Sequence, residues 1–178
     1  MANTTFQGPV TSKAGFITTG PANVVDADSS VSLTVATHSG KIVHNDAAGA
    51  VTYTLPATNA NSDSAVAGPG ADLNNLSNVG AKFEIFSSIT KTGDLVVQVA
   101  NATDVIIGSA SFIDDTSDNM VGFETASTSD TITLNGSTTG GVTFAKIECT
   151  VIASGKWLVS VVTGGTGDLA TPFSAAVS

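Results

Sequence analysis

The sequence predicts an all-β domain, either a β-sandwich or a small jelly-roll-like β-barrel, with extended N- and C-terminal arms. About nine short runs of β-branched and aromatic residues are separated by turn residues, which is typical of sandwiches and barrels. No segment keeps a 3.6-residue apolar period over three turns, so we expect little helix. The length of 178 residues fits one such domain.

The first predicted strand is VSLTVA at 31–36, where Val31, Leu33 and Val35 alternate with small or polar residues. Alternation with a period of two indicates a strand with one buried face. Strands of the same character are predicted at 40–46, 50–55, 81–86, 95–99, 104–108, 130–136, 141–152 and 156–162. Gly, Asn and Asp between several of these runs suit turns with positive φ. The strands define a β domain over 31–163.

Residues 1–30 and 164–178 lack alternation and are rich in Gly and Pro or begin with Gly, so each is predicted to be an extended arm. A lone domain has little that would order two arms, whereas a subunit in a lattice can hold a neighbour with each. Two long loops are also expected, at 57–80 and at 113–129, and the first has room for one short turn of helix at 65–78.

Charged residues make up 12% of the chain, against about 25% in a typical soluble domain. Such a surface either relies on hydroxyls and amides or is covered by partner subunits. All six cations are lysines and the net charge is −9, which excludes the cationic footprint of a nucleic-acid-binding protein. No apolar run approaches the ~20 residues of a membrane span, and MANTTFQGPV lacks a signal-peptide layout, so synthesis in a cytoplasm is expected.

Candidate catalytic and metal-binding residues are few, and we expect no enzyme, cofactor or metal site. The acidic residues of the second loop lack EF-hand spacing, so a solvated loop is favoured and calcium at a subunit interface stays open. We interpret Cys149 and Trp157 as packed strand residues and the two histidines as structural. The residues considered for acid–base or metal chemistry are Asp114, Asp115, Asp118, Glu124, His38 and His44.

Several segments carry a resemblance to a known class of proteins. They are GKIVHNDAAGAVTYTLPAT (40–58), AKFEIFSS (81–88), DVIIGSASF (104–112) and the run from Gly122 to Ala175, with its DTITLNGSTTGG, Gly-Lys-Trp and ATPF pieces. Over most of residues 38–176, the chain resembles small virion structural proteins of tailed bacteriophages, especially marine ones, of the capsid decoration or head type.

The resemblance implies a non-enzymatic decoration subunit on the virion capsid surface. Such a subunit would bind the major capsid protein across capsomer junctions, stabilise the head and act as a homotrimer. The same sequence vocabulary occurs in tail-fibre, head-fibre and collar or tip components, which form the alternative reading. No catalytic residue is implied by it.

The residues expected at an interface are apolar side chains of the two arms. They have no predicted strand to belong to, and an exposed apolar side chain on an arm is stabilised by burial in a partner. Folding back onto their own domain is the alternative. These residues are Phe6, Val10, Phe16, Ile17 and Phe173.

Overall fold

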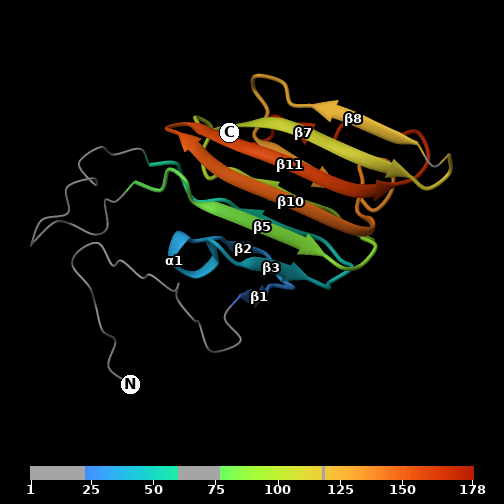
Figure 1. Cartoon of the computed structure of the whole chain (residues 1–178), viewed down its shortest axis with the longest axis horizontal. Helices are drawn as coiled ribbons and strands as arrows, with labels where there is room; N and C mark the ends of the chain where they lie inside the picture. The colour runs from blue at the N-terminus through green and yellow to red at the C-terminus, as the bar shows by residue number, and fades with distance from the viewer. Residues whose placement is uncertain (1–22, 60–76, 118) are drawn as a thin grey trace, which may run out of the picture.

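Two mixed β-sheets pack face to face in the computed structural model, which describes residues 23–59, 77–117 and 119–178 (Figure 1). The first sheet has seven strands in the order β1 (Val24–Asp26), β3 (Ile42–Asn45), β5 (Lys82–Ser87), β10 (Val142–Ala153), β11 (Lys156–Gly165), β7 (Val105–Asp114) and β8 (Met120–Glu124). The second has five, in the order β12 (Phe173–Ser174), β9 (Thr131–Leu134), β6 (Leu95–Gln98), β4 (Val51–Thr54) and β2 (Val31–Ser32). The all-β prediction is confirmed.

The first half of the chain winds between the two sheets. Strands β1, β3 and β5 are parallel neighbours in the first sheet, while β2, β4 and β6 are parallel neighbours in the second. The chain leaves one sheet for the other and then returns, so each new strand runs in the same direction as the previous strand of the same sheet. These parallel pairs differ from the antiparallel pairing of a jelly roll.

The second half of the chain closes this winding with antiparallel strands. Strand β10 pairs with β5 and β11, strand β9 pairs with β6, and strands β7 and β8 form a hairpin. Antiparallel neighbours end the succession of parallel turns, and β11 then pairs in parallel with β7. The long strands β7, β10 and β11 therefore form a continuous platform in the first sheet (Figure 1).

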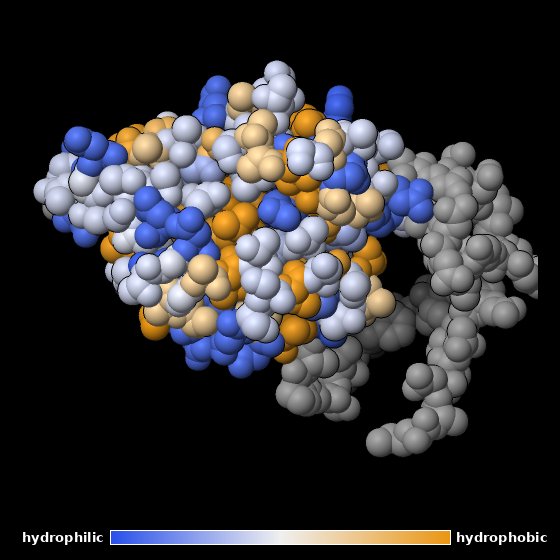
Figure 2. Space-filling model, turned by 180° about the vertical axis from the view of Figure 1, so that it is seen from behind, coloured by the Kyte–Doolittle hydropathy of each residue, from blue (hydrophilic) through white to orange (hydrophobic). Residues whose placement is uncertain are grey.

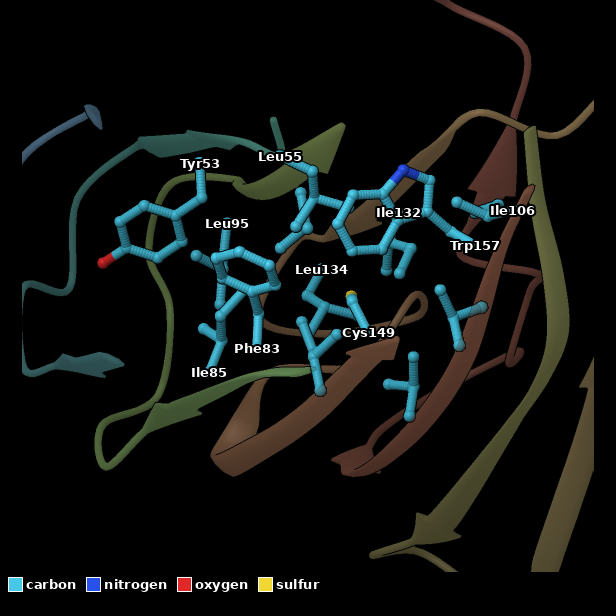
Figure 3. Close-up of a cluster of buried hydrophobic side chains, with 14 of the residues drawn as sticks. Tyr53, Leu55, Phe83, Ile85, Leu95, Ile106, Ile132, Leu134, Cys149 and Trp157 are labelled. Carbon is cyan, nitrogen blue, oxygen red and sulfur yellow. The ribbon is translucent and has the colours of Figure 1, made fainter. Parts of the chain in front are cut away.

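The core lies between the sheets, where alternate residues of each strand point inward (Figure 3). Trp157 and Phe83 are both fully buried, and their rings meet edge-on. Cys149 lies in register between Phe83 and Val159 and is also fully buried. Burial raises the pKa of the Cys149 thiol to about 12, so it stays protonated and unreactive at neutral pH. The interpretations of Cys149 and Trp157 as packed strand residues are confirmed.

The predicted strand at 31–36 is wrong in its second half. Strand β2 ends at Ser32, and α1 (Val35–His38) forms one helical turn in its place. The Thr34 hydroxyl accepts a hydrogen bond from the Thr37 N–H at 3.3 Å and so caps this turn. The chain must cross here from the second sheet to the first, and the crossing overrides the local strand propensity.

The predicted boundaries also change at both ends of the domain. Strand β1 lies inside the predicted N-terminal arm, so the domain begins before residue 31. At the other end, β11 runs to Gly165 and β12 pairs with β9, so 164–178 is not an extended arm. The predicted loop at 113–129 contains the end of β7 and all of β8. Residues 1–22 and most of the 57–80 loop, with its expected helical turn, lie outside the described residues.

Candidate interaction surface

The outer face of the first sheet carries exposed apolar side chains, which we call the outer strip. Met120 is 72% exposed and Leu158 is 49% exposed, values far above those of core residues. Leu158 lies in register with Ile107, and Met120 lies in register with Ile113. The strip consists of Ile107, Ile113, Met120, Leu158 and Val162. Ser109, Ser111 and Ser160 lie on the same face between the two pairs, so hydroxyl groups separate the two apolar ends of the strip. Exposed apolar groups gathered on one face mark interaction sites on soluble proteins.

Consecutive apolar residues in single strands produce the outer strip. In β11, Trp157 and Leu158 are neighbours, and strand geometry sends the first into the core and the second outward. Ile106 and Ile107 repeat the arrangement in β7. A sheet with one solvated face normally alternates apolar and polar residues, so Leu158 and Ile107 depart from this pattern on the outer face.

Paired charges border the strip on the outer face of β5 and β10. Lys146 Nζ lies 2.8 Å from Glu148 Oε1 and 3.5 Å from Glu84 Oε1, while Lys82 Nζ lies 3.2 Å from Glu148 Oε2. Hydrogen bonds from Lys146 and Lys82 hold the pKa of Glu148 below its ordinary value. Two lysines and two glutamates balance, so the border presents no net charge to a partner.

Strand β8 forms one edge of the first sheet and adjoins the strip. It pairs with β7 on one side, and in the part of the chain that the structure describes it has no strand on the other. Its sequence, MVGFE, lacks the lysine, proline or bulge that usually protects an edge strand. The open edge therefore lies beside the Ile113 and Met120 end of the strip, and β8 is the uppermost strand of the first sheet in Figure 1.

The outer face of the second sheet differs in character. One row crosses all five of its strands and consists of Ser32, Thr54, Gln98, Thr131 and Ser174. Figure 2 shows the molecule from this side, where pale and blue residues separate small orange areas. Thr131 is buried, and its hydroxyl donates to Asp130 Oδ1 at 2.7 Å. The other four side chains are exposed or half-buried, so their hydroxyl and amide groups solvate this face without charges.

The residues predicted for an interface are not those that form the strip. Phe6, Val10, Phe16 and Ile17 lie outside the described residues. Phe173 is corrected, because it is only 8% exposed and lies in register with the buried Ile132 of β9. Its side chain belongs to the core, which agrees with the alternative that the arm folds back onto its own domain. The strip residues were missed, although adjacent apolar pairs such as Trp157-Leu158 were a visible signal.

A polar relay lies on the outer face near β1. His44 Nδ1 is 3.2 Å from Asp26 Oδ1, and His44 Nε2 is 2.9 Å from the Ser88 hydroxyl. Ser88, His44 and Asp26 thus stand in the arrangement of a nucleophile, its base and an orienting acid. The Asp26 side chain is 69% exposed, however, so water competes for both hydrogen bonds. This relay is best described as a cross-strand polar contact.

The other candidate polar residues do not assemble into a site. His38 lies in α1, apart from His44, and its Nδ1 accepts the Thr34 N–H at 3.0 Å. Asp114 accepts hydrogen bonds from Ser117 and Thr116, which lower its pKa and hold the turn. Across 23–59, 77–117 and 119–178, no three His, Cys, Asp or Glu side chains are grouped as metal ligands. Asp118 lies outside the described residues.

Comparisons with known proteins return no relative of this chain. No family model, no curated protein and no solved structure matches it. Among the described residues, no helix has the length and apolar character needed to cross a membrane.

Proposed function

We propose that this chain is a non-enzymatic structural subunit of a tailed-phage virion, a capsid decoration protein that binds the major capsid protein and acts as a homotrimer. The observation that carries the proposal is the outer strip, which exposes apolar side chains on long, hydrogen-bonded strands. The sequence resemblance to virion structural proteins supplies the phage context. Apolar groups on a rigid sheet bind with little loss of conformational entropy, which suits a protein whose task is binding.

The two outer faces support a division of roles. The outer strip and the β8 edge form the face for a protein partner. The paired lysines and glutamates beside the strip carry no net charge, so they repel neither an acidic nor a basic partner. The hydroxyl-rich face of the second sheet is the one that water solvates. A subunit repeated over a lattice needs only a modest contact, because linked copies raise the effective concentration of each contact.

A fibre, head-fibre or collar component is the second candidate, and the winding of β1 to β6 favours it. Parallel turns that stack on one another are the building principle of elongated solenoid proteins. In this chain the antiparallel strands β9 and β10 lie against the last parallel strands, so the stack ends instead of continuing as a shaft. This closure favours decoration over a long fibre.

A binding experiment tests the proposed role. The double variant Ile107→Ser/Leu158→Ser changes the outer strip, and Thr52→Ser/Val96→Ser changes a matched pair in register on the opposite outer face. Each purified protein is sedimented with particles of its phage that lack the subunit. We expect the first variant to lose at least ten-fold in affinity and the control to bind like the wild type. Equal binding by the strip variant and the wild type would contradict the proposal.

Cryo-electron microscopy of intact particles separates the two candidates. Density for this protein in many copies at local threefold positions of the capsid is the result expected for decoration. A few copies at one vertex or along the tail would replace the decoration proposal with the fibre or collar reading.

A further inference from the structure

A buried lysine meets a buried asparagine at the end of β3. Lys91 Nζ lies 3.0 Å from Asn45 Oδ1, and the two residues are 2% and 0% exposed. We propose that these side chains react to form an intramolecular amide bond between Lys91 Nζ and Asn45 Cγ. The bond would be a covalent cross-link within one subunit, and it is independent of the role proposed above.

Lys91 is held in the core by its own backbone. Its N–H donates to the Gly141 carbonyl at 2.9 Å, and its side chain extends from the β5–β6 connection to the end of β3. Nζ also donates to the Ala47 carbonyl. In the described ranges no carboxylate forms an ion pair with this ammonium, so its charged form is poorly compensated. Burial lowers the pKa of Lys91, which increases the fraction of neutral amine, the nucleophilic form.

Asn45 is fixed in an orientation that presents its amide to the amine. Its Nδ2 donates to the Ala27 carbonyl at 3.2 Å, and the Tyr53 hydroxyl donates to the same carbonyl. Oδ1 is thereby directed to Lys91 Nζ, and Cγ is one covalent bond further. The contact holds the amine and the amide side by side, and the reaction requires Nζ to move from Oδ1 to Cγ, the carbon bonded to it.

Two exposed aspartates, Asp28 and Asp46, lie at the surface near the end of β3. Asp46 follows Asn45 directly, and its N–H donates to Asp28 Oδ1 at 3.0 Å. The hydrogen bond between the two side chains raises the pKa of Asp46, so this carboxyl holds a proton to higher pH than usual. The charge of Asp28 raises the pKa of Lys91 and so partly opposes the effect of burial.

The reaction balances without an oxidant or a cofactor. The neutral amine attacks Cγ, a proton passes from Nζ to Nδ2, the Cγ–Nδ2 bond breaks and ammonia leaves. The product joins two positions 46 residues apart in the sequence, so it restricts the unfolded chain in the way a disulfide does.

Intact-mass spectrometry of the denatured full chain tests the proposal. The expected mass is that of the sequence less one ammonia, and digestion should give a branched peptide that joins Lys91 to Asn45. The variant Lys91→Met should recover the full mass, while Asn45→Asp should form the same bond with loss of water. Asp28→Asn removes a charge that favours the ammonium form of Lys91, so the cross-link should form faster.

Two results would overturn the cross-link. One is the full sequence mass in folded wild-type protein after prolonged incubation. The other is an ammonia loss that persists in Lys91→Met, because it would arise from an asparagine elsewhere, such as Asn135 before Gly136. The wild-type measurement is decisive even if a variant fails to fold.

Discussion

The ring of Phe83 packs edge-on against the ring of Trp157, with centroids 5.7 Å apart and an interplanar angle of 61°. The two residues come from β5 and β11, which lie on opposite sides of β10 in the first sheet. Their contact therefore crosses the central strand of the core. Trp157 is the one tryptophan of the sequence, so its fluorescence reports on this contact.

Replacing Phe83 with alanine should destabilise the protein by about 3–5 kcal/mol, because it removes a fully buried ring and leaves a cavity beside Trp157. Urea unfolding followed by Trp157 fluorescence measures the effect. Leu158→Ala is the matched control, since its side chain neighbours Trp157 in sequence but points outward, and a change of about 0.5 kcal/mol or less is expected. Similar midpoints for the two variants would show that the described core is incorrect.

Most of the strands were predictable from the sequence, because they alternate in a simple way. The predicted runs at 81–86 and 156–162 coincide closely with β5 and β11. Short strands were missed where the local signal is weak, as in β1 with three residues and β12 with two. The parallel winding was not predictable, because pairing between distant strands is set by tertiary packing and not by local propensity.

The candidate surface was harder to predict than the fold. A strand with two adjacent apolar residues reads as buried on both faces, and only the structure shows that Leu158 and Ile107 point away from the core. Phe173 illustrates the reverse error, because a two-residue strand after a glycine-rich stretch leaves almost no period to detect. Its burial depends on pairing with β9, a long-range contact.

The stability of the protein should fall in acid partly through Glu148. Its folded-state pKa is lowered by hydrogen bonds from Lys146 and Lys82, so its contribution is fully present above its unfolded pKa. That contribution is lost as the pH falls through the lower, folded-state pKa. Because the side chains are partly exposed, the effect should be about 1 kcal/mol or less.

Thermal melts between pH 7 and pH 2 measure this effect in the wild type and in Glu148→Gln. The variant should be slightly less stable at pH 7, and its melting temperature should decline less steeply in acid. Glu124→Gln, on the exposed strand β8, is the control and should follow the wild-type curve. Parallel curves for wild type and Glu148→Gln would contradict the predicted role of the ion pairs.

Gly108→Ala should destabilise the pairing of β7 with β11. Gly108 has φ of 155°, and a Cβ atom built there would lie 1.9 Å from the Val159 carbonyl oxygen, so the backbone must shift. A loss of about 1–3 kcal/mol is expected from the strain. Gly122→Ala in β8 is the control, because its nearest contact would be the Ala110 carbonyl oxygen at 3.9 Å. Urea midpoints that rank the two variants in the opposite order would contradict this account.

The C-terminal segment should stabilise its own domain by binding to the second sheet, and we call such a segment a latch. The Asp130 carboxylate accepts hydrogen bonds from the Ala176 N–H at 2.8 Å and from the Val177 N–H at 3.3 Å. The Phe173 side chain belongs to the core, and its strand β12 pairs with β9. Phe173→Ala should therefore destabilise the domain by about 3 kcal/mol. Ser174→Ala, in the same strand but exposed, should have little effect.

Chemical denaturation of the isolated subunit distinguishes this latch from a free arm. If residues 164–178 were an arm that binds a neighbour, Phe173→Ala would leave the subunit's unfolding midpoint unchanged and weaken only its assembly. If the segment is a latch, Phe173→Ala should lower the unfolding midpoint of the isolated subunit. Assembly should then weaken only because less of the protein is folded. Asp130→Asn tests the same segment independently. The variant keeps the size of the side chain but removes the charge that the backbone N–H groups of Ala176 and Val177 contact. We expect the free energy of unfolding to fall by about 1–3 kcal/mol.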